Sequence, residues 1–166
     1  MGCRHADTHT GYLWQSGYEN HVFSTPMFPD LVPAFSQWQA ASRKIAIYSS
    51  GSVFAQKLLF RHVQDPSSSD PSATISLEDR ICDWFDTTNA GLKTQKDSYQ
   101  LIANKLRLEA RQVLFFSDNV NEVKAAKQAG MDAFVVDRPG NAPLSEGDRK
   151  EFTVVTSLDQ VNLSDR

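Results

Sequence analysis

Ser49, Ser50, Lys93 and Asp118 are the residues whose types could together carry out chemistry on a phosphate group. Ser49 and Ser50 open a Ser-Ser-Gly-Ser string, Lys93 stands in a Gly-Leu-Lys tripeptide, and Asp118 follows an apolar run. Hydroxyl and ammonium groups bind phosphate oxygens, and Mg²⁺ takes one or two carboxylate ligands together with phosphate and water oxygens. These residue types therefore indicate a phosphate-binding site with Asp118 as a metal ligand.

The Ser-Ser-Gly-Ser string has a functional and a structural interpretation. A hydroxyl at a strand end, a glycine that permits close approach and a helix N-terminus together form a cradle for an anion. In the structural interpretation, Ser52 caps the following helix while Ser49 and Ser50 fill a turn. Lys93, taken alone, is more typical of a solvated surface charge, so the site depends on where the fold places these residues.

Asp118 and Glu122 lie four positions apart around the start of a predicted helix. Asn119 with Glu122 three residues later resembles a capping box, in which the acid serves the helix. The alternative is that Glu122 supports the metal site as a second acid. Asp118 has no comparable structural role in the pattern and is therefore the expected metal ligand.

Strand-like and helical patterns alternate along the chain, which is typical of a parallel α/β sheet. Continuous apolar runs at 44–48, 113–116 and 133–136 predict central strands that are covered on both faces. Weaker strands are expected at 84–87 and, at a sheet edge, at 153–156. Helices with apolar residues at i, i+3 and i+4 are predicted to begin near Asp30, Ser52, Thr94 and Asn119.

The parallel arrangement decides where the polar residues meet. The C-terminal ends of parallel strands lie at one edge of the sheet, and ligands bind at that edge. Ser49 and Ser50 follow the first apolar run, Asp118 follows the second, and Lys93 lies between the strand at 84–87 and the next helix. We therefore expect these residues to converge on one site.

Composition narrows the classes of partner. The 17 Lys and Arg residues against 20 Asp and Glu residues give a net charge of −3, which disfavours non-specific nucleic-acid binding. No apolar stretch is long enough for a signal peptide or a membrane span, and the two cysteines, Cys3 and Cys82, form no disulfide framework. We expect a monomer without nucleic-acid or membrane partners, located in the cytoplasm with the nucleus as a second location.

Two segments fall outside the α/β pattern. The Ser- and Pro-rich segment 65–76 has little to bury and is predicted to be a surface loop without a role in the chemistry. The N-terminal segment carries an aromatic cluster of Tyr12, Leu13, Trp14 and Tyr18, which needs a partner surface.

Several longer stretches carry a more specific pattern than the single motifs. They lie at 11–14, 45–60, 85–99, 115–130 and 138–142, and IAIYSSGSVFAQKLLF at 45–60 is the most specific. In these stretches the sequence resembles the enolase-phosphatases, or acireductone synthases, of the haloacid-dehalogenase superfamily. The resemblance implies a Mg²⁺-dependent enzyme of methionine salvage. Its small phosphorylated substrate would be 2,3-diketo-5-methylthiopentyl-1-phosphate, which is enolised and dephosphorylated to acireductone.

The resemblance also implies a fold and a role for each polar residue. Residues 25–166 would form a three-layer, Rossmann-like haloacid-dehalogenase core on a parallel sheet, and residues 1–24 would be a remnant of the helical cap. Ser49 would bind the phosphate, Ser50 would contact the substrate, Lys93 would bind the phosphate and Asp118 would bind Mg²⁺. These are the residues that the strand ends indicate independently.

The sequence departs from the family pattern on its N-terminal side. The family begins with a strand that ends in a nucleophilic Asp, followed by a second acid two positions later and then by the helical cap. Asp7-Thr8-His9-Thr10 has a similar spelling, but no apolar strand precedes it. No catalytic nucleophile is therefore assigned, and this chain is expected to be inactive.

Two further expectations follow from this departure. The core would lack the first strand, which lies at the sheet centre in the superfamily, so the neighbouring strands would have unpaired backbone groups. The remaining residues would bind phosphate without transferring it, because no carboxylate forms the covalent intermediate. The alternative to an inactive phosphatase is a non-catalytic descendant that binds phosphorylated ligands or a partner protein.

Overall fold

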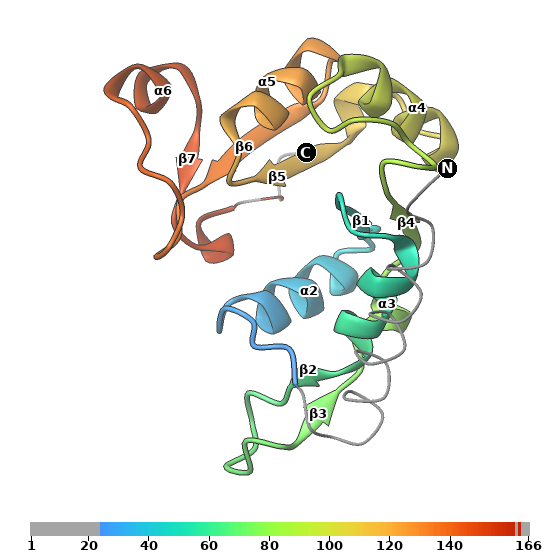
Figure 1. Ribbon diagram of the computed structural model, residues 1–166, viewed down its shortest axis with the longest axis vertical. Coiled ribbons are helices and arrows are strands. Elements are labelled where there is room, and N and C mark those ends of the chain that lie inside the picture. Colours follow the sequence, from blue (N-terminus) through green and yellow to red (C-terminus); the bar gives the residue numbers. More distant parts are fainter. Residues whose placement is uncertain (1–23, 162, 164–166) are drawn as a thin grey trace, which may run out of the picture.

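Parallel strands form two sheets in the computed structural model, which describes residues 24–161 and 163 (Figure 1). β1 (Ala46–Tyr48) pairs with β4 (Asp83–Phe85), while β5 (Leu114–Ser117), β6 (Asp132–Val136) and β7 (Val154–Val155) form a second sheet in that order. Each strand overlaps a predicted strand, which confirms the α/β class. Three predicted features lie outside the described residues: the aromatic cluster, the Asp7-Thr8-His9-Thr10 string and the cap remnant at 1–24, of which only residue 24 is described.

Four helices of the described residues begin close to the predicted positions, one before β1 and three between strands, and a further helix at Glu146–Glu151 was not predicted. The side chains of Ser52 and Asn119 accept backbone hydrogen bonds in the first turns of α3 and α5, as their types predict. α4 begins after Gln95 rather than after Thr94. None of these helices has the length and apolar content that a membrane crossing requires. Their bounds are α2 Leu31–Ala40, α3 Val53–Arg61, α4 Lys96–Leu106, α5 Val120–Gln128 and α6 Glu146–Glu151.

Asp30 precedes α2, but its side chain links distant segments instead of capping the helix. Its carboxylate accepts hydrogen bonds from the Arg138 guanidinium, from the Ser157 hydroxyl at 3.1 Å and from Leu158 N–H at 2.6 Å. Burial by itself would raise the pKa of Asp30, but these donors hold it below its ordinary value. The predicted cap was wrong because a buried arginine takes this carboxylate.

Apolar side chains form two clusters on opposite faces of the strands. One cluster contains Phe85 and Tyr99 and packs with α4 and α5, and the other contains Trp38 and Trp84 and packs with α2 and α3. The neighbours Trp84 and Phe85 of β4 belong to different clusters, because side chains alternate between the two faces of a strand. Helices therefore cover both faces of the strands, giving the expected three layers.

β1 and β5 each have a strand neighbour on one side only within the described residues. The prediction that three apolar runs form central strands is therefore correct for β6 and wrong for β1 and β5 in the described chain. The apolar side chains of these two strands, including Ile47 and Phe116, are half-buried rather than buried.

A short antiparallel hairpin lies at the end of the molecule that is distant from β5–β7 (Figure 1). It consists of β2 (Val63–Gln64) and β3 (Thr74–Ile75), joined by an exposed loop. The predicted loop at 65–76 thus includes two residues of strand. Paired segments of two residues are too short to produce a recognisable apolar alternation.

Candidate phosphate-binding site

The loop that carries Lys93 is fixed by hydrogen bonds from buried or half-buried hydroxyls. Tyr48, Ser98 and Tyr99 donate to the carbonyls of residues 91, 92 and 93 at 2.7, 2.8 and 2.6 Å. Burial raises the pKa of Tyr48 and of Tyr99 above the ordinary value, so both phenols remain protonated donors at neutral pH. The main chain at Lys93 is therefore held firmly.

Lys93 lies between the C-terminal ends of β1 and β5. Its Nζ is 2.6 Å from Glu122 Oε2 and 5.7 Å from the centroid of the Tyr48 ring, which precedes Ser49. Ser117, the last residue of β5, donates to the same Glu122 oxygen at 2.7 Å. Glu122 therefore does not form the predicted capping box at the start of α5, because its carboxylate bonds to Lys93 and Ser117 instead; its support of a metal site stays a prediction.

Ser49 and Ser50 follow β1 directly, as predicted. The Ser49 hydroxyl oxygen accepts the Gly51 N–H at 3.2 Å, which leaves its own proton available for a ligand oxygen. Ser50 is exposed, and its hydroxyl makes no hydrogen bond to the part of the chain that is described. Both hydroxyls can therefore donate to a phosphate at this edge.

The N-terminus of α3 contributes less to an anion site than the sequence suggests. Val53 N–H donates to Asp86 Oδ2 at 3.0 Å, and the Ser52 hydroxyl already takes an amide of the first turn. The backbone hydrogen bond from Asn89 is the main reason why the pKa of Asp86 lies below its ordinary value. A carboxylate of the protein itself thus occupies part of the predicted cradle.

Asp118 is exposed at the end of β5 and is oriented by an amide. Asn141 Nδ2 donates to Asp118 Oδ2 at 3.0 Å, while Asn141 Oδ1 accepts the Arg138 N–H at 2.6 Å. Arg138 in turn is the partner of Asp30. A chain of contacts therefore fixes the turn after β6 and, through it, one oxygen of the expected metal ligand.

The side chains around Asp118 fit a Mg²⁺ ion that takes Asp118 as its carboxylate ligand and completes its coordination with oxygens from outside the protein. Among the described residues, no group of three or more His, Cys, Asp or Glu side chains is arranged to hold a metal. Glu122 is engaged by Lys93 and Ser117, and Asp118 Oδ1 makes no hydrogen bond to the described residues. Mg²⁺ accepts such a site when phosphate and water oxygens supply its other ligands.

Comparison with known families identifies the family to which the chain belongs. The sequence profile described as haloacid dehalogenase-like hydrolase matches residues 6–130, which include Ser49, Lys93 and Asp118. The chain belongs to the haloacid dehalogenase-like hydrolases. This membership confirms the Rossmann-like parallel-sheet architecture that the resemblance implies.

Relatives of this haloacid dehalogenase-like hydrolase are named enolase-phosphatase E1. The chain is 50% identical to the protein of Podospora anserina and 48% identical to that of Neurospora crassa, each over 153 residues. Both matches cover 91% of this chain and 62% of the relative, so this chain spans less than two thirds of their length.

Solved structures show the same architecture. The UTR4 protein of Saccharomyces cerevisiae has a TM-score of 0.85 at 34% identity, over 96% of this chain and 68% of that one. CbbY from Rhodobacter sphaeroides, at 17% identity, has a TM-score of 0.70 over 96% of this chain and 67% of that one. The second similarity concerns the fold alone.

Several residues that surround this candidate site were not predicted to lie there. Asp86 was placed inside the strand predicted at 84–87, whereas β4 ends at Phe85, so that Asp86 stands at the ligand-binding edge. Asn141 lies in a turn after β6. The Arg-Pro-Gly-Asn string indicates this turn, but it does not indicate that Asn141 contacts Asp118. The hydroxyls of Ser98 and Tyr99 lie on the buried face of α4, where core packing is the ordinary interpretation.

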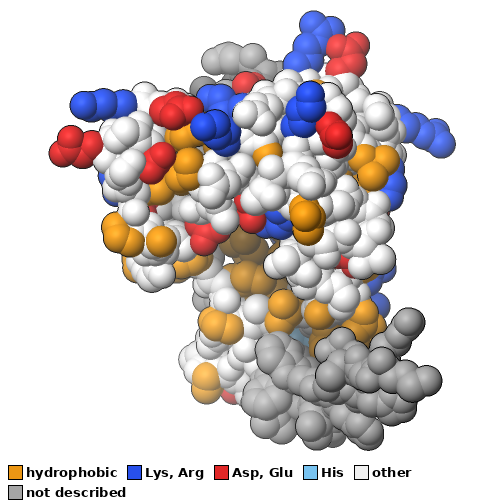
Figure 2. All heavy atoms as spheres, turned by 45° about the horizontal axis from the view of Figure 1, so that its top comes forward, with side chains coloured by type: hydrophobic (Ala, Val, Ile, Leu, Met, Phe, Trp, Pro, Cys, Tyr) orange, Lys and Arg blue, Asp and Glu red, His pale blue; other side chains and the backbone are white. Residues whose placement is uncertain are grey.

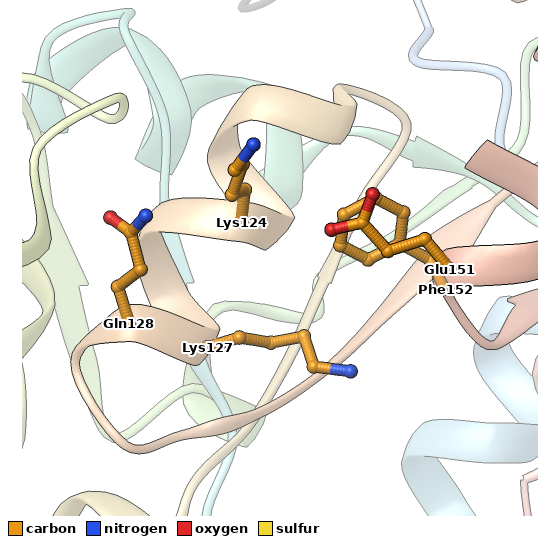
Figure 3. A pocket seen from close by; sticks show the side chains of 5 residues that line it. All are labelled: Lys124, Lys127, Gln128, Glu151 and Phe152. Carbon is orange, nitrogen blue, oxygen red and sulfur yellow. The ribbon is translucent and has the colours of Figure 1, made fainter. Parts of the chain in front are cut away.

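A shallow pocket elsewhere on this haloacid dehalogenase-like hydrolase contains none of the predicted site residues. It is lined by Lys124, Lys127, Gln128, Glu151 and Phe152, from α5 and from the end of α6 (Figure 3). Lys127 lies over the Phe152 ring at 5.7 Å. The pocket is separate from the strand ends, and we assign it no role in the chemistry.

Proposed function

We propose that this chain is the phosphate-binding part of an enolase-phosphatase of methionine salvage that acts on 2,3-diketo-5-methylthiopentyl-1-phosphate in the cytosol. The observation that carries the proposal is the position of Lys93, bonded to Glu122 after β5 and lying over Tyr48 at the end of β1. The names of relatives at about 50% identity support the substrate class.

Each residue at the strand ends has a proposed role. Lys93 binds phosphate oxygens as a point charge, and Ser49 donates its hydroxyl proton to one of them. Ser50 contacts the substrate beside the phosphate. Asp118 holds Mg²⁺, which when bound would neutralise phosphate charge, and Asn141 keeps one oxygen of Asp118 in place.

Phosphate transfer, in contrast to binding, has no candidate nucleophile among the described residues at this edge. The Asp86 carboxylate accepts three backbone N–H groups, from Val53, Thr88 and Asn89. Glu122 is held by Lys93 and Ser117. A carboxylate that attacks phosphorus needs a free oxygen facing the phosphate. The free oxygen of Asp118 is the one proposed to bind Mg²⁺, and we therefore propose that this chain binds the substrate without hydrolysing it.

The hydrolysis part of the proposal is tested with the purified 166-residue chain and Mg²⁺. Phosphate release from 2,3-diketo-5-methylthiopentyl-1-phosphate and from a simple aryl phosphate should equal that of a control without protein. The Asp118→Ala variant identifies contamination, because a contaminating phosphatase is unaffected by it. Release that the wild type shows and Asp118→Ala abolishes would contradict the proposed inactivity.

The binding part is tested by calorimetric titration of the same chain with inorganic phosphate in the presence of Mg²⁺. Loss of a charge-assisted contact costs about 1.5–3 kcal/mol, so Lys93→Ala should bind phosphate at least tenfold more weakly. Lys124→Ala, in the separate pocket on α5, is the matched control and should bind like the wild type. Equal affinities of wild type and Lys93→Ala would refute the proposed site.

A further inference from the structure

Gln56 is a buried polar side chain near the start of α3. It is 3% exposed, and its Nε2 donates to the Gly51 carbonyl at 2.7 Å and to the Phe85 carbonyl at 2.9 Å. Both neighbours are carbonyl oxygens, which only accept hydrogen bonds, so the nitrogen of the amide and not its oxygen faces them. Gln56 therefore joins the turn after β1 to the last residue of β4.

The Phe85 carbonyl holds both ends of this turn. Ser49 N–H donates to it directly at 3.1 Å, and Gly51 is tied to it through the Gln56 amide. Ser50, which lies between them, is exposed, and the Ser49 hydroxyl oxygen accepts the Gly51 N–H at 3.2 Å. The conformation of the turn that carries both serines is therefore set from its buried side by Gln56.

The contact with Gln56 also fixes the direction of the peptide group between Gly51 and Ser52. The peptide bonds of the described residues are trans, and in a trans peptide the N–H points opposite to the carbonyl. Because the Gly51 carbonyl points at Gln56, the Ser52 N–H points away from the buried side. Ser52 is exposed, and its N–H donates to none of the described residues. This N–H is therefore available, with the Ser49 and Ser50 hydroxyls, to an anion at the strand ends.

The first turn of α3 has hydrogen-bond partners other than Gln56. Val53 N–H donates to Asp86, and the Ser52 hydroxyl accepts from the amide of Ala55. Packing does not account for an amide at position 56 either, because Gln56 Oε1 is buried and accepts no hydrogen bond from the described residues. A buried acceptor without a partner is unfavourable, and an apolar side chain of the same length would avoid this cost. What the amide contributes is its two donated hydrogen bonds at the turn.

The distribution of surface charge makes the placement of uncharged donors important. Figure 2 shows Lys and Arg side chains interspersed with Asp and Glu side chains on the described part of one face, without a broad basic patch. Lys93 provides a cation at the strand ends, but it is paired with Glu122. An anion at this edge therefore depends on hydroxyl and N–H groups that point toward it.

We propose that Gln56 is a positioning residue for the phosphate-binding turn. Its carboxamide does not touch the phosphate; it holds the Gly51 carbonyl inward and thereby presents the Ser49 hydroxyl and the Ser52 N–H to phosphate oxygens. Without the carboxamide, the Gly51 carbonyl can turn to water, since Gly51 is exposed. This role rests on the proposed function, because it concerns the turn with which that site would bind phosphate.

The test compares two variants of the full 166-residue chain by calorimetric titration with inorganic phosphate. Gln56→Met keeps the length of the side chain but donates no hydrogen bond, and it should bind phosphate about fivefold or more weakly than the wild type. Leu58→Val changes another buried side chain of α3 and is the matched control, which should lower the urea midpoint but bind phosphate like the wild type. If Gln56 served packing alone, Gln56→Met would resemble Leu58→Val, so equal phosphate affinities of the two variants would overturn the proposal.

Titrations with and without Mg²⁺ locate the effect within the site. Gln56 contacts the turn after β1, whereas Asp118 follows the end of β5. The factor by which Gln56→Met weakens phosphate binding should therefore be the same under both conditions. A loss that appears only with Mg²⁺ would assign the effect to the metal ligand and contradict the proposed role.

NMR of the wild-type chain provides the measurement if Gln56→Met does not fold. Addition of inorganic phosphate should shift the amide proton resonance of Ser52, because its N–H gains an acceptor. The amide of Ala55 already donates to the Ser52 hydroxyl, and its resonance should shift far less. A Ser52 resonance that moves no more than that of Ala55 would overturn the proposal.

The titrations separate failure of this role from failure of the proposed function. If the wild type binds no phosphate, the proposed function fails and the role of Gln56 fails with it. If Lys93→Ala binds weakly while Gln56→Met binds like the wild type, only the role of Gln56 fails.

Discussion

Lys93 Nζ lies 2.6 Å from Glu122 Oε2, and this ion pair joins the loop after β4 to the first turn of α5. The two side chains are 20% and 12% exposed, so water screens the pair less than it screens a pair on an open surface. Ser117 shares the same carboxylate oxygen. The pair therefore holds the ammonium at the point where β1 and β5 end.

Removing the acid of this pair should destabilise the fold. Glu122→Ala leaves the Lys93 ammonium and the Ser117 hydroxyl without their partner, at an expected cost of about 1–3 kcal/mol in the free energy of unfolding. Urea denaturation measures the change. Glu151→Ala, an exposed acid near the end of α6, should change stability by less than about 0.5 kcal/mol. A loss for Glu122→Ala no larger than that of this control would contradict the prediction.

The amide of Asn141 should affect the dependence of phosphate binding on Mg²⁺. Asn141→Ala removes the hydrogen bond to Asp118 Oδ2, and loss of a residue that orients a metal ligand weakens metal binding by about tenfold or more. Calorimetry should therefore show a smaller gain in phosphate affinity on addition of Mg²⁺ than in the wild type. Asn121→Ala, an exposed change in α5, should keep the full gain. An undiminished gain in Asn141→Ala would show that Asp118 needs no such support.

A methyl group at Gly91 should displace the Lys93 loop. Gly91 has a φ of +97°, and a Cβ built there would lie 2.7 Å from Ser98 Oγ, the hydroxyl that holds the Leu92 carbonyl. Gly91→Ala should therefore lose about 1–3 kcal/mol of stability and bind phosphate more weakly. Gly147→Ala in α6, where the new Cβ meets nothing closer than 3.6 Å, should be neutral or stabilising. Equal effects of the two substitutions, measured by thermal unfolding, would refute the argument.

Asp30 should make stability depend on pH in the acid range. Its pKa in the folded chain lies below the ordinary value of 3.8, so its contribution is complete above about pH 4 and is lost as pH falls through the folded pKa. Asp30→Asn leaves the half-buried Arg138 guanidinium without its carboxylate partner and should cost about 1–3 kcal/mol at pH 7.

The difference between wild type and Asp30→Asn should therefore narrow between pH 4 and pH 2, as measured by urea unfolding at several pH values. Asp79→Asn, an exposed change in the described chain, is the control and should change stability by less than about 0.5 kcal/mol. A constant deficit of Asp30→Asn down to pH 2 would show that the carboxylate is not the stabilising form.

The positions of the parallel strands along the chain and of the polar residues at their ends were largely predictable, because apolar runs and strand ends are local features of the sequence. Ser49, Ser50 and Asp118 stand where the ends of their predicted strands place them. Their proposed roles remain to be tested. Lys93 was placed only in a loop, and its partner Glu122 could be recognised only once β5 and α5 were seen together.

Other features depend on contacts between residues far apart in the sequence. Asp30 and Arg138 are 108 positions apart, and a local pattern favours the helix cap over the buried ion pair. β1 and β5 have the composition of central strands, but each has one edge without a strand neighbour among residues 24–161. The apolar composition of a strand indicates that both of its faces are covered, but it does not indicate whether a neighbouring strand lies beside it.

The bonds from Tyr48, Ser98 and Tyr99 to the carbonyls of residues 91–93 join uncharged groups. Dissolved ions screen charges at short range, with a Debye length of about 3 Å at 1 M, and they scarcely weaken neutral hydrogen bonds. The loop that carries Lys93 should therefore keep its conformation at high salt concentration, where the Lys93 ammonium attracts anions far less. Crystals grown at high ionic strength would record this loop in its working conformation even when no ligand is bound.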